Sequence, residues 1–420
     1  MNEISAWKKK VQQSIEKKRW DECLQYAEQL RQEYKSKAYL QMAEQAYCAV
    51  LTASEKQRDI NALHGLALLY YRDYMLRFTS KPVSTLPYGK QECFQKAKGI
   101  LERLLQMERQ PESLYRYAQV LYRNAKDEQG NGDFSALCRQ KEQAYILYDE
   151  AVSMMEKWKI ADKGLYCRTC YGLCRCGLEA FSLHSVMMEE LMLAFSVPGT
   201  LYGGRSSHIA RLRRMYYCLE RVLEIEGLPR RIEDMAAVAQ AKQTYEKSWD
   251  IYYLLGKIFD CAGQFGLCHD QKSACRLAER YYTYACEIDS IRRQTQQPVP
   301  GFGHMYTALL TFYLRHRQEE HFYAAWERYH PFAVFSADFH LLSQARWLIA
   351  RREYTAARHF LAAQLQDGQW RSGTKRRAAA MQDIIQVALS GSTDGLQGIY
   401  KPFHLKQLNK IGRKNRNVSP

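Results

Sequence analysis

Apolar and small side chains recur along this chain at the spacing of an amphipathic helix, and they come in paired segments. The clearest pair lies between Tyr252 and Asp289. Its first segment carries aromatic, leucine and glycine residues on one face, namely Tyr252, Leu255, Gly256 and Phe259. Its second segment alternates small and bulky residues at i, i+4 and i+7, namely Ala278, Tyr282 and Ala285. This spacing predicts two helices that pack closely through small residues.

The same pattern returns along the chain with turns of different length. One further pair has its small and bulky positions at Ala118, Ala144, Tyr148 and Ala151. Compact pairs lie near Val11, Leu310 and Ala345, where 12 residues separate Val11 from Cys23 and Ala345 from Ala357. The middle pairs have expanded turns, namely Phe78–Pro87, Gln129–Asp133 and Cys261–Asp270. Such insertions often lie on a binding face, although neutral variation of surface loops explains them equally well.

These helix pairs resemble the tetratricopeptide repeat in a degenerate form. That family places an aromatic residue, Leu-Gly and Tyr on one helix and Ala-x3-aromatic on the next, as Leu255-Gly256 and Ala278–Tyr282 do here. The resemblance implies an all-α solenoid of antiparallel helix pairs, because one pair cannot bury its apolar face alone. It also implies a binding scaffold, and it leaves the bound partner unnamed.

Breaks in the pattern divide the chain into four segments. Only 10 Pro and 23 Gly interrupt 420 residues, which favours long helices over an all-β fold. Loop-like stretches at Ser196–Ser207 and Arg292–Gly303 are the strongest breaks. We expect N-terminal repeats over 1–197, middle repeats over 198–297, C-terminal pairs with a capping helix over 298–390, and a basic tail over 391–420.

The charge of the chain favours an acidic partner. The formal net charge is +16, and residues 337–420 carry +9 of it, with 14 Lys and Arg against 5 Asp and Glu. The candidate nucleic-acid-binding residues are 13 of these 14 basic residues: Arg346, Arg351, Arg352, Arg358, Arg371, Lys375, Arg376, Arg377, Lys406, Lys410, Arg413, Lys414 and Arg416. Several such cations can neutralise phosphates without regard to base sequence. A solvated basic end is the alternative interpretation.

The 13 cysteines are expected to be reduced. Met1–Gln13 lacks the apolar run of a signal peptide, and no stretch reaches the roughly 18 apolar residues that a membrane helix needs. We therefore expect a cytoplasmic protein without a membrane partner. Four thiols at Cys167, Cys170, Cys174 and Cys176 suffice in number for a metal. One continuous helix would place Cys176 away from the other three, so we favour a packing role and expect no metal.

One short motif suggests catalysis. Arg315-His316-Arg-Gln-Glu-Glu-His321 resembles the Arg-polar-x4-His motif of HEPN ribonucleases over seven residues. The resemblance implies acid–base catalysis by His321 at a ribose 2′-OH and phosphate stabilisation by Arg315. No nucleotide-binding or hydrolase motif accompanies it.

The main prediction is a non-catalytic scaffold or adaptor that binds a protein partner on its concave face and uses no cofactor. Its basic C-terminal region is expected to contact RNA or DNA. The first alternative is a regulator whose principal ligand is nucleic acid, and the second is a HEPN-like ribonuclease. The sequence leaves the oligomeric state open.

Overall fold

The fold is built from helices alone in the part of the chain that the computed structural model describes. The described residues are 3–33, 36–53, 56–78, 85–127, 134–181, 186–195, 204–241, 250–295, 304–332, 337–367, 370, 372–393, 396 and 408. They form 18 helices and no strand, and helices that are neighbours in sequence pack in succession. The prediction of an all-α solenoid is confirmed.

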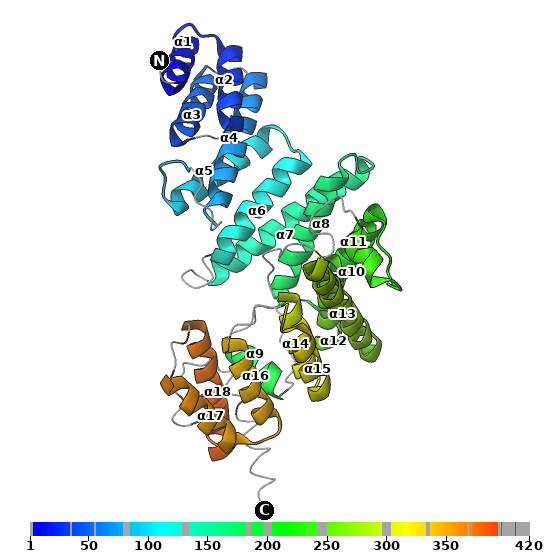
Figure 1. Cartoon of the computed structure of the whole chain (residues 1–420). Helices are drawn as coiled ribbons and strands as arrows, with labels where there is room; N and C mark the ends of the chain where they lie inside the picture. The colour runs from blue at the N-terminus through cyan, green and yellow to red at the C-terminus, as the bar shows by residue number, and fades with distance from the viewer. Residues whose placement is uncertain are drawn as a thin grey trace, which may run out of the picture. The chain divides into compact units, whose positions relative to one another are not determined.

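The chain divides into two compact units, Met1–Ala180 and Phe181–Pro420. The helices of unit 1 are α1 (Glu3–Glu16), α2 (Trp20–Glu33), α3 (Lys37–Thr52), α4 (Lys56–Leu76), α5 (Lys90–Met107), α6 (Pro111–Asp127), α7 (Phe134–Lys157) and α8 (Lys163–Phe181, whose last residue opens unit 2). Figure 1 shows them in order from blue to green.

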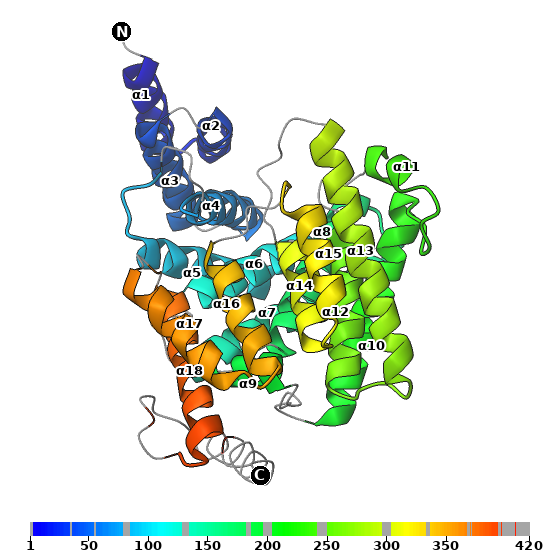
Figure 2. The ribbon, with the colours of Figure 1, turned by 60° about the horizontal axis from the view of Figure 1, so that its bottom comes forward.

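Unit 2 contains ten of the described helices. They are α9 (Val186–Phe195), α10 (Arg205–Glu226), α11 (Met235–Gln240), α12 (Asp250–Gln264), α13 (Gln271–Thr295), α14 (His304–Arg315), α15 (Glu319–Tyr329), α16 (Ala337–Ala350), α17 (Tyr354–Asp367) and α18 (Ser372–Ser390). Figure 2 shows α12 to α15 side by side, and α9 beside α16 and α18. The expected boundary at 197/198 falls after the division into units, so α9 belongs to unit 2.

Three helix pairs share one three-residue turn, at 17–19, 316–318 and 351–353. The middle residue of each has a positive φ: Lys18 (55°), Arg317 (59°) and Arg352 (67°). The backbone N–H of the next residue donates to a carbonyl five residues earlier: Arg19 to Ser14 (2.8 Å), Gln318 to Tyr313 (3.0 Å) and Glu353 to Leu348 (2.9 Å). This bonding is that of a Schellman motif, which ends one helix and admits the next at once. It accounts for the compact spacing in the sequence.

The connection between α12 and α13 is shorter than the ten-residue turn expected over Cys261–Asp270. Helix α12 continues through Gln264 and α13 begins at Gln271, so six residues join them. Gly266 has φ 62°, and the N–H of Leu267 donates to the carbonyl of Ala262 at 2.8 Å. The first residues of the expected turn, Cys261 to Gln264, therefore belong to helix α12. The expected turn Gln129–Asp133 lies outside the described residues, and so does 79–84 within Phe78–Pro87.

The helix pairs approach closely where a glycine faces a tyrosine ring. A Cβ on Gly256 would lie 2.7 Å from the Tyr282 ring, and one on Gly172 would lie 2.6 Å from the Tyr148 ring. The small and bulky positions noted in the sequence are buried at Leu255, Gly256, Ala278, Tyr282, Ala285, Ala118, Ala144, Tyr148 and Ala151. Phe259 is half-buried and stacks on Tyr281 with ring centroids 5.7 Å apart.

Tyrosine hydroxyls bond to carboxylates on neighbouring helices, which helps to explain why the chain uses 30 tyrosines. The hydroxyl of Tyr282 donates to Asp260 at 3.0 Å, and that of Tyr306 donates to Asp289 at 2.7 Å. Burial, together with the adjacent carboxylate, raises the pKa of both phenols above the ordinary value. Each hydroxyl therefore stays a donor at neutral pH, and the buried carboxylates have partners.

Candidate functional site

Unit 1 has an open groove with a volume of about 440 Å³ between α2 and α4. Helix α2 contributes four of its residues, α3 one and α4 one: Leu24, Gln25, Glu28, Gln29, Tyr47 and Asn61. The volume falls in the range of small-ligand sites, ~300–1,000 Å³. None of these residues had been identified from the sequence.

The floor of the groove is Tyr47, which is 1 % exposed. Its ring lies against Gly65 of α4, where a Cβ would overlap the ring. Its hydroxyl donates to Glu28 Oε2 at 2.8 Å. The floor is therefore held from α2 through Glu28 and from α4 through the close backbone approach, so its position is fixed by packing.

Glu28 is kept ionised by its neighbours. Gln32 Nε2 donates to Oε1 at 2.8 Å, and Arg31 Nε donates to Oε2 at 3.1 Å. Burial alone would raise the pKa of Glu28, but the hydrogen bonds from Arg31, Tyr47 and Gln32 lower it below the ordinary value. Because Arg31 balances its charge, Glu28 acts as a support for Tyr47 more than as an open anion site.

The rim of the groove offers free amides. Gln25, Gln29 and Asn61 are exposed, and none of them hydrogen-bonds another residue in the described parts of the chain. A side-chain amide has both donors and an acceptor, so it can pair with the N–H and C=O of a peptide group. The half-buried Leu24 adds an apolar contact. The groove is thus chemically suited to an extended polypeptide segment.

The basic residues predicted to bind nucleic acid fall into three groups. Arg346, Arg377 and Arg351 are bound to carboxylates: Arg346 and Arg377 to Glu190, and Arg351 to Glu319. The exposed ones without a partner among the described residues are Arg352, Arg358, Lys375 and Arg376. Arg371, Lys406, Lys410, Arg413, Lys414 and Arg416 lie outside the described residues. Of the two groups that the structure describes, the second has the free guanidinium or ammonium groups that phosphate contacts need.

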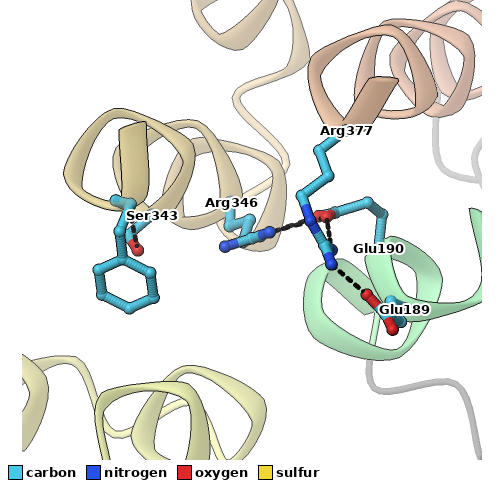
Figure 3. A network of polar contacts seen from close by, with 6 residues as sticks. Glu189, Glu190, Ser343, Arg346 and Arg377 are labelled. Atoms are coloured by element: carbon cyan, nitrogen blue, oxygen red, sulfur yellow. Dashed lines mark hydrogen bonds and ion pairs between the residues drawn. The ribbon is translucent and has the colours of Figure 1, made fainter. Parts of the chain in front are cut away.

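Glu190 on α9 is the centre of the polar network in Figure 3. Arg346 donates to it from Nε at 2.8 Å and from Nη2 at 2.7 Å, while Arg377 donates from Nη1 at 3.0 Å. Burial alone would raise the pKa of Glu190, but the two guanidiniums lower it. The sequence offered one clue that was missed: Glu189-Glu190 stands alone in the apolar run Val186–Phe195.

The Arg315–His321 pattern places its two residues in different surroundings. Arg315 Nη1 lies 2.6 Å from Asp260 Oδ1, and Asp260 also accepts from Tyr282. Burial alone would raise the pKa of Asp260, but Arg315 holds it low. The ring of His321 lies 5.6 Å from that of Tyr313. This geometry gives Arg315 a role in joining α12 to α14, and the ribonuclease interpretation stays a prediction.

The cysteine cluster and the helices of the described residues were the places to look for a metal site or a membrane span. Cys167, Cys170, Cys174 and Cys176 are all buried, and Cys176 Sγ lies 3.1 Å from the carbonyl of Lys141. No group of three or more His, Cys, Asp or Glu side chains within the described ranges is placed to hold a metal ion. No helix of the described chain combines the length and the apolar character needed to cross a bilayer.

Similarity to known proteins gives no further guide to the site. Comparisons of the chain with protein-family models, with curated proteins and with solved structures found no match. The function is therefore inferred from the geometry of this chain alone.

Proposed function

We propose that this protein is a non-catalytic interaction scaffold that binds an extended segment of a partner protein in the groove of unit 1. The groove itself carries the proposal: it has a fixed aromatic floor at Tyr47, and its rim amides Gln25, Gln29 and Asn61 have no partner among the described residues. Successive packing of helix pairs supports it, since stacked pairs present long surfaces for partners.

Recognition would rest on main-chain hydrogen bonds and one apolar contact. The three rim amides can each pair with a peptide group, while Leu24 takes an apolar side chain. The floor is already ordered by Glu28 and Gly65, so binding need not order it. Preorganisation of this kind lowers the entropic cost of binding.

The test begins with peptides selected from a random-sequence display library on the full chain. We expect the selected peptides to bind about 5- to 10-fold more weakly to Asn61→Ala or Gln25→Ala, because each substitution removes a hydrogen bond worth ~1 kcal/mol. Gln41→Ala is the matched control, since Gln41 is an exposed amide of α3 that does not line the groove. Isothermal titration calorimetry measures the affinities. Equal affinity for all variants would contradict the proposal.

A second candidate function is nucleic-acid binding by unit 2. One observation favours it: Arg352, Arg358, Lys375 and Arg376 are exposed and have no carboxylate partner among the described residues. Four phosphate contacts would give a slope of about −3 for log affinity against log salt concentration. Replacing all four by Ala should flatten that slope in a fluorescence titration with single-stranded RNA.

Arg328→Ala provides the control for that titration, because Arg328 is also exposed but is paired with Glu287 at 2.8 Å. We expect it to leave the slope nearly unchanged. An absence of RNA and DNA binding by the unsubstituted chain at low salt would exclude this candidate.

A further inference from the structure

Helix α9 is enclosed by other helices of unit 2. Four successive residues are buried: Glu190 (0 % exposed), Leu191 (0 %), Met192 (7 %) and Leu193 (9 %). Successive residues of an α-helix are 100° apart, so these four cover most of its circumference. Both ribbon views show α9 beside α16 and α18, and α9 also contacts α14. Helix α9 thus occupies a site formed by α14, α16 and α18.

The surrounding helices come from one continuous part of the chain, and α9 does not. Residues 304–390 contain α14 to α18, which pack on one another in succession. Helix α9 lies before α10 in sequence, and Glu190 is 156 residues away from Arg346, to which it binds. The relation between α9 and residues 304–390 is that of a ligand and a receptor within one chain.

Apolar contacts form one part of this interface. Leu191 and Met192 belong to the same buried cluster as Leu342, Ile349, Met381 and Ile385 of α16 and α18. Met192 Sδ also lies 4.0 Å from Gln264 Nε2 of α12. An amphipathic helix in a hydrophobic groove is a common mode of protein recognition.

The polar part of the interface binds two adjacent carboxylates. Arg346, with a side chain 5 % exposed, forms a two-pronged pair with Glu190. Arg377 donates to Glu190 from Nη1 and to Glu189 from Nη2 at 2.5 Å. A planar guanidinium in a fixed position is selective for carboxylate geometry. The site therefore specifies two neighbouring acids followed by apolar residues, which in α9 are Glu189-Glu190-Leu-Met-Leu193.

Helix α9 has two properties of an exchangeable occupant. It has ten residues, and a free helix of fewer than ~12–15 residues is marginal in water, so its order depends on the site. Its attachment also relies on buried charges, and their desolvation offsets much of the attraction between them. A helix of the same chemistry can bind the same arginines once α9 leaves, although the tether gives α9 the advantage of a high effective concentration.

We propose that α14, α16 and α18 form a receptor site for a short, largely apolar helix with two adjacent acidic residues, and that a partner helix of this chemistry replaces α9. This site is separate from the groove of unit 1 and does not depend on the function proposed for that groove. Replacement would need no new pocket, because Arg346 and Arg377 already lie where the carboxylates of the incoming helix must be.

The probe is a fluorescent peptide with the sequence of residues 184–197, added to the full chain. In the unsubstituted protein α9 occupies the site, so the apparent affinity is reduced by the small fraction of open molecules. Glu190→Gln and Glu190→Arg weaken the internal helix and should raise the affinity for the peptide by about tenfold or more. Arg346→Glu should abolish binding, and a peptide carrying Arg at position 190 should restore it.

Circular dichroism checks that each variant is folded. If Arg346→Glu does not fold, Arg377→Glu takes its place, because that side chain is 33 % exposed and its reversal disturbs the core less. Arg351→Glu is the control, since Arg351 is paired with Glu319 of α15 and not with α9, and should leave peptide affinity unchanged. Folded Glu190 variants that gain no affinity, or peptide binding that is indifferent to the charge of the receptor arginines, would overturn the proposal.

Discussion

Two sites between helices in this protein differ in whether they are filled. In unit 1 the groove beside α2 and α4 is open, and its rim amides are in solvent. In unit 2 the site among α14, α16 and α18 is occupied by α9, in which Glu190 to Leu193 are buried.

The difference follows from the side chains that line each site. Amides such as Gln25 and Asn61 are well solvated, so the groove of unit 1 can stay open at little cost. The lining in unit 2 combines apolar residues with Arg346, and these would be poorly satisfied without an occupant. These linings are the basis for proposing association at the first site and exchange of an internal helix at the second.

The largest expected effect comes from removing the carboxylate of Glu190, which pairs with Arg346 in the filled site. Glu190→Ala leaves Arg346 buried without its carboxylate, and we expect the free energy of unfolding to fall by about 3–5 kcal/mol. Urea denaturation followed by far-UV circular dichroism measures it. Glu319→Ala removes an exposed pair with Arg351 and should cost less than about 1 kcal/mol. Similar losses for the two variants would show that α9 is not held by Glu190.

The next effect concerns the close helix contacts that both units share. Gly256→Ala places a Cβ 2.7 Å from the Tyr282 ring, so we expect a loss of about 1–3 kcal/mol from overpacking. Gly99→Ala in α5 is the matched control, because nothing lies within 4 Å of its Cβ position. It should raise the free energy of unfolding by about 0.5–1 kcal/mol through helix propensity alone. Urea denaturation of both variants measures the two changes in the free energy of unfolding, which should have opposite signs.

Local structure could be predicted from the sequence because it depends on the spacing of nearby residues. The compact pairs were identified from the distances Val11–Cys23 and Ala345–Ala357, and both turn out to have the same Schellman turn. Gly256 and Ala278 were identified as close-packing positions for the same reason. The α12–α13 turn is shorter than expected, because α12 continues through Gly263 to Gln264 and ends just before Gly266, which has a positive φ.

The two sites could not be predicted from the sequence, because neither depends on local periodicity. The partner of Arg346 is 156 residues away, and in the sequence Arg346 looks like the exposed Arg352. Only the fold shows that Arg346 is buried and paired, whereas Arg352 is exposed and has no carboxylate partner in the described ranges. The rim residues Gln25, Gln29 and Asn61 are ordinary exposed polar residues in sequence, and they form a site only through the packing of α2 against α4.

A smaller effect should appear on acidification of the open groove. The pKa of Glu28 is lowered in the folded state, so the unfolded chain binds more protons in acid and the stabilisation is lost as pH falls through the lowered pKa. Glu28→Gln should therefore cost ~1 kcal/mol at neutral pH, and the difference from the unsubstituted chain should shrink at about pH 2. Denaturation at both pH values tests it. A difference that grows in acid would mean that Glu28 does not act as an ionised support.

The smallest effect is expected at the rim, and it tests whether the open groove is separable from the fold. Asn61 is exposed and makes no hydrogen bond within the described residues, so Asn61→Ala should change the free energy of unfolding by less than about 0.5 kcal/mol. Gln41→Ala should behave alike. If Asn61→Ala cost more than about 1 kcal/mol, the rim would be structural, and weaker peptide binding by that variant could no longer be assigned to the groove. An unchanged stability, measured beside the large loss at Glu190, would mean that unit 1 can vary its contact residues freely while unit 2 cannot.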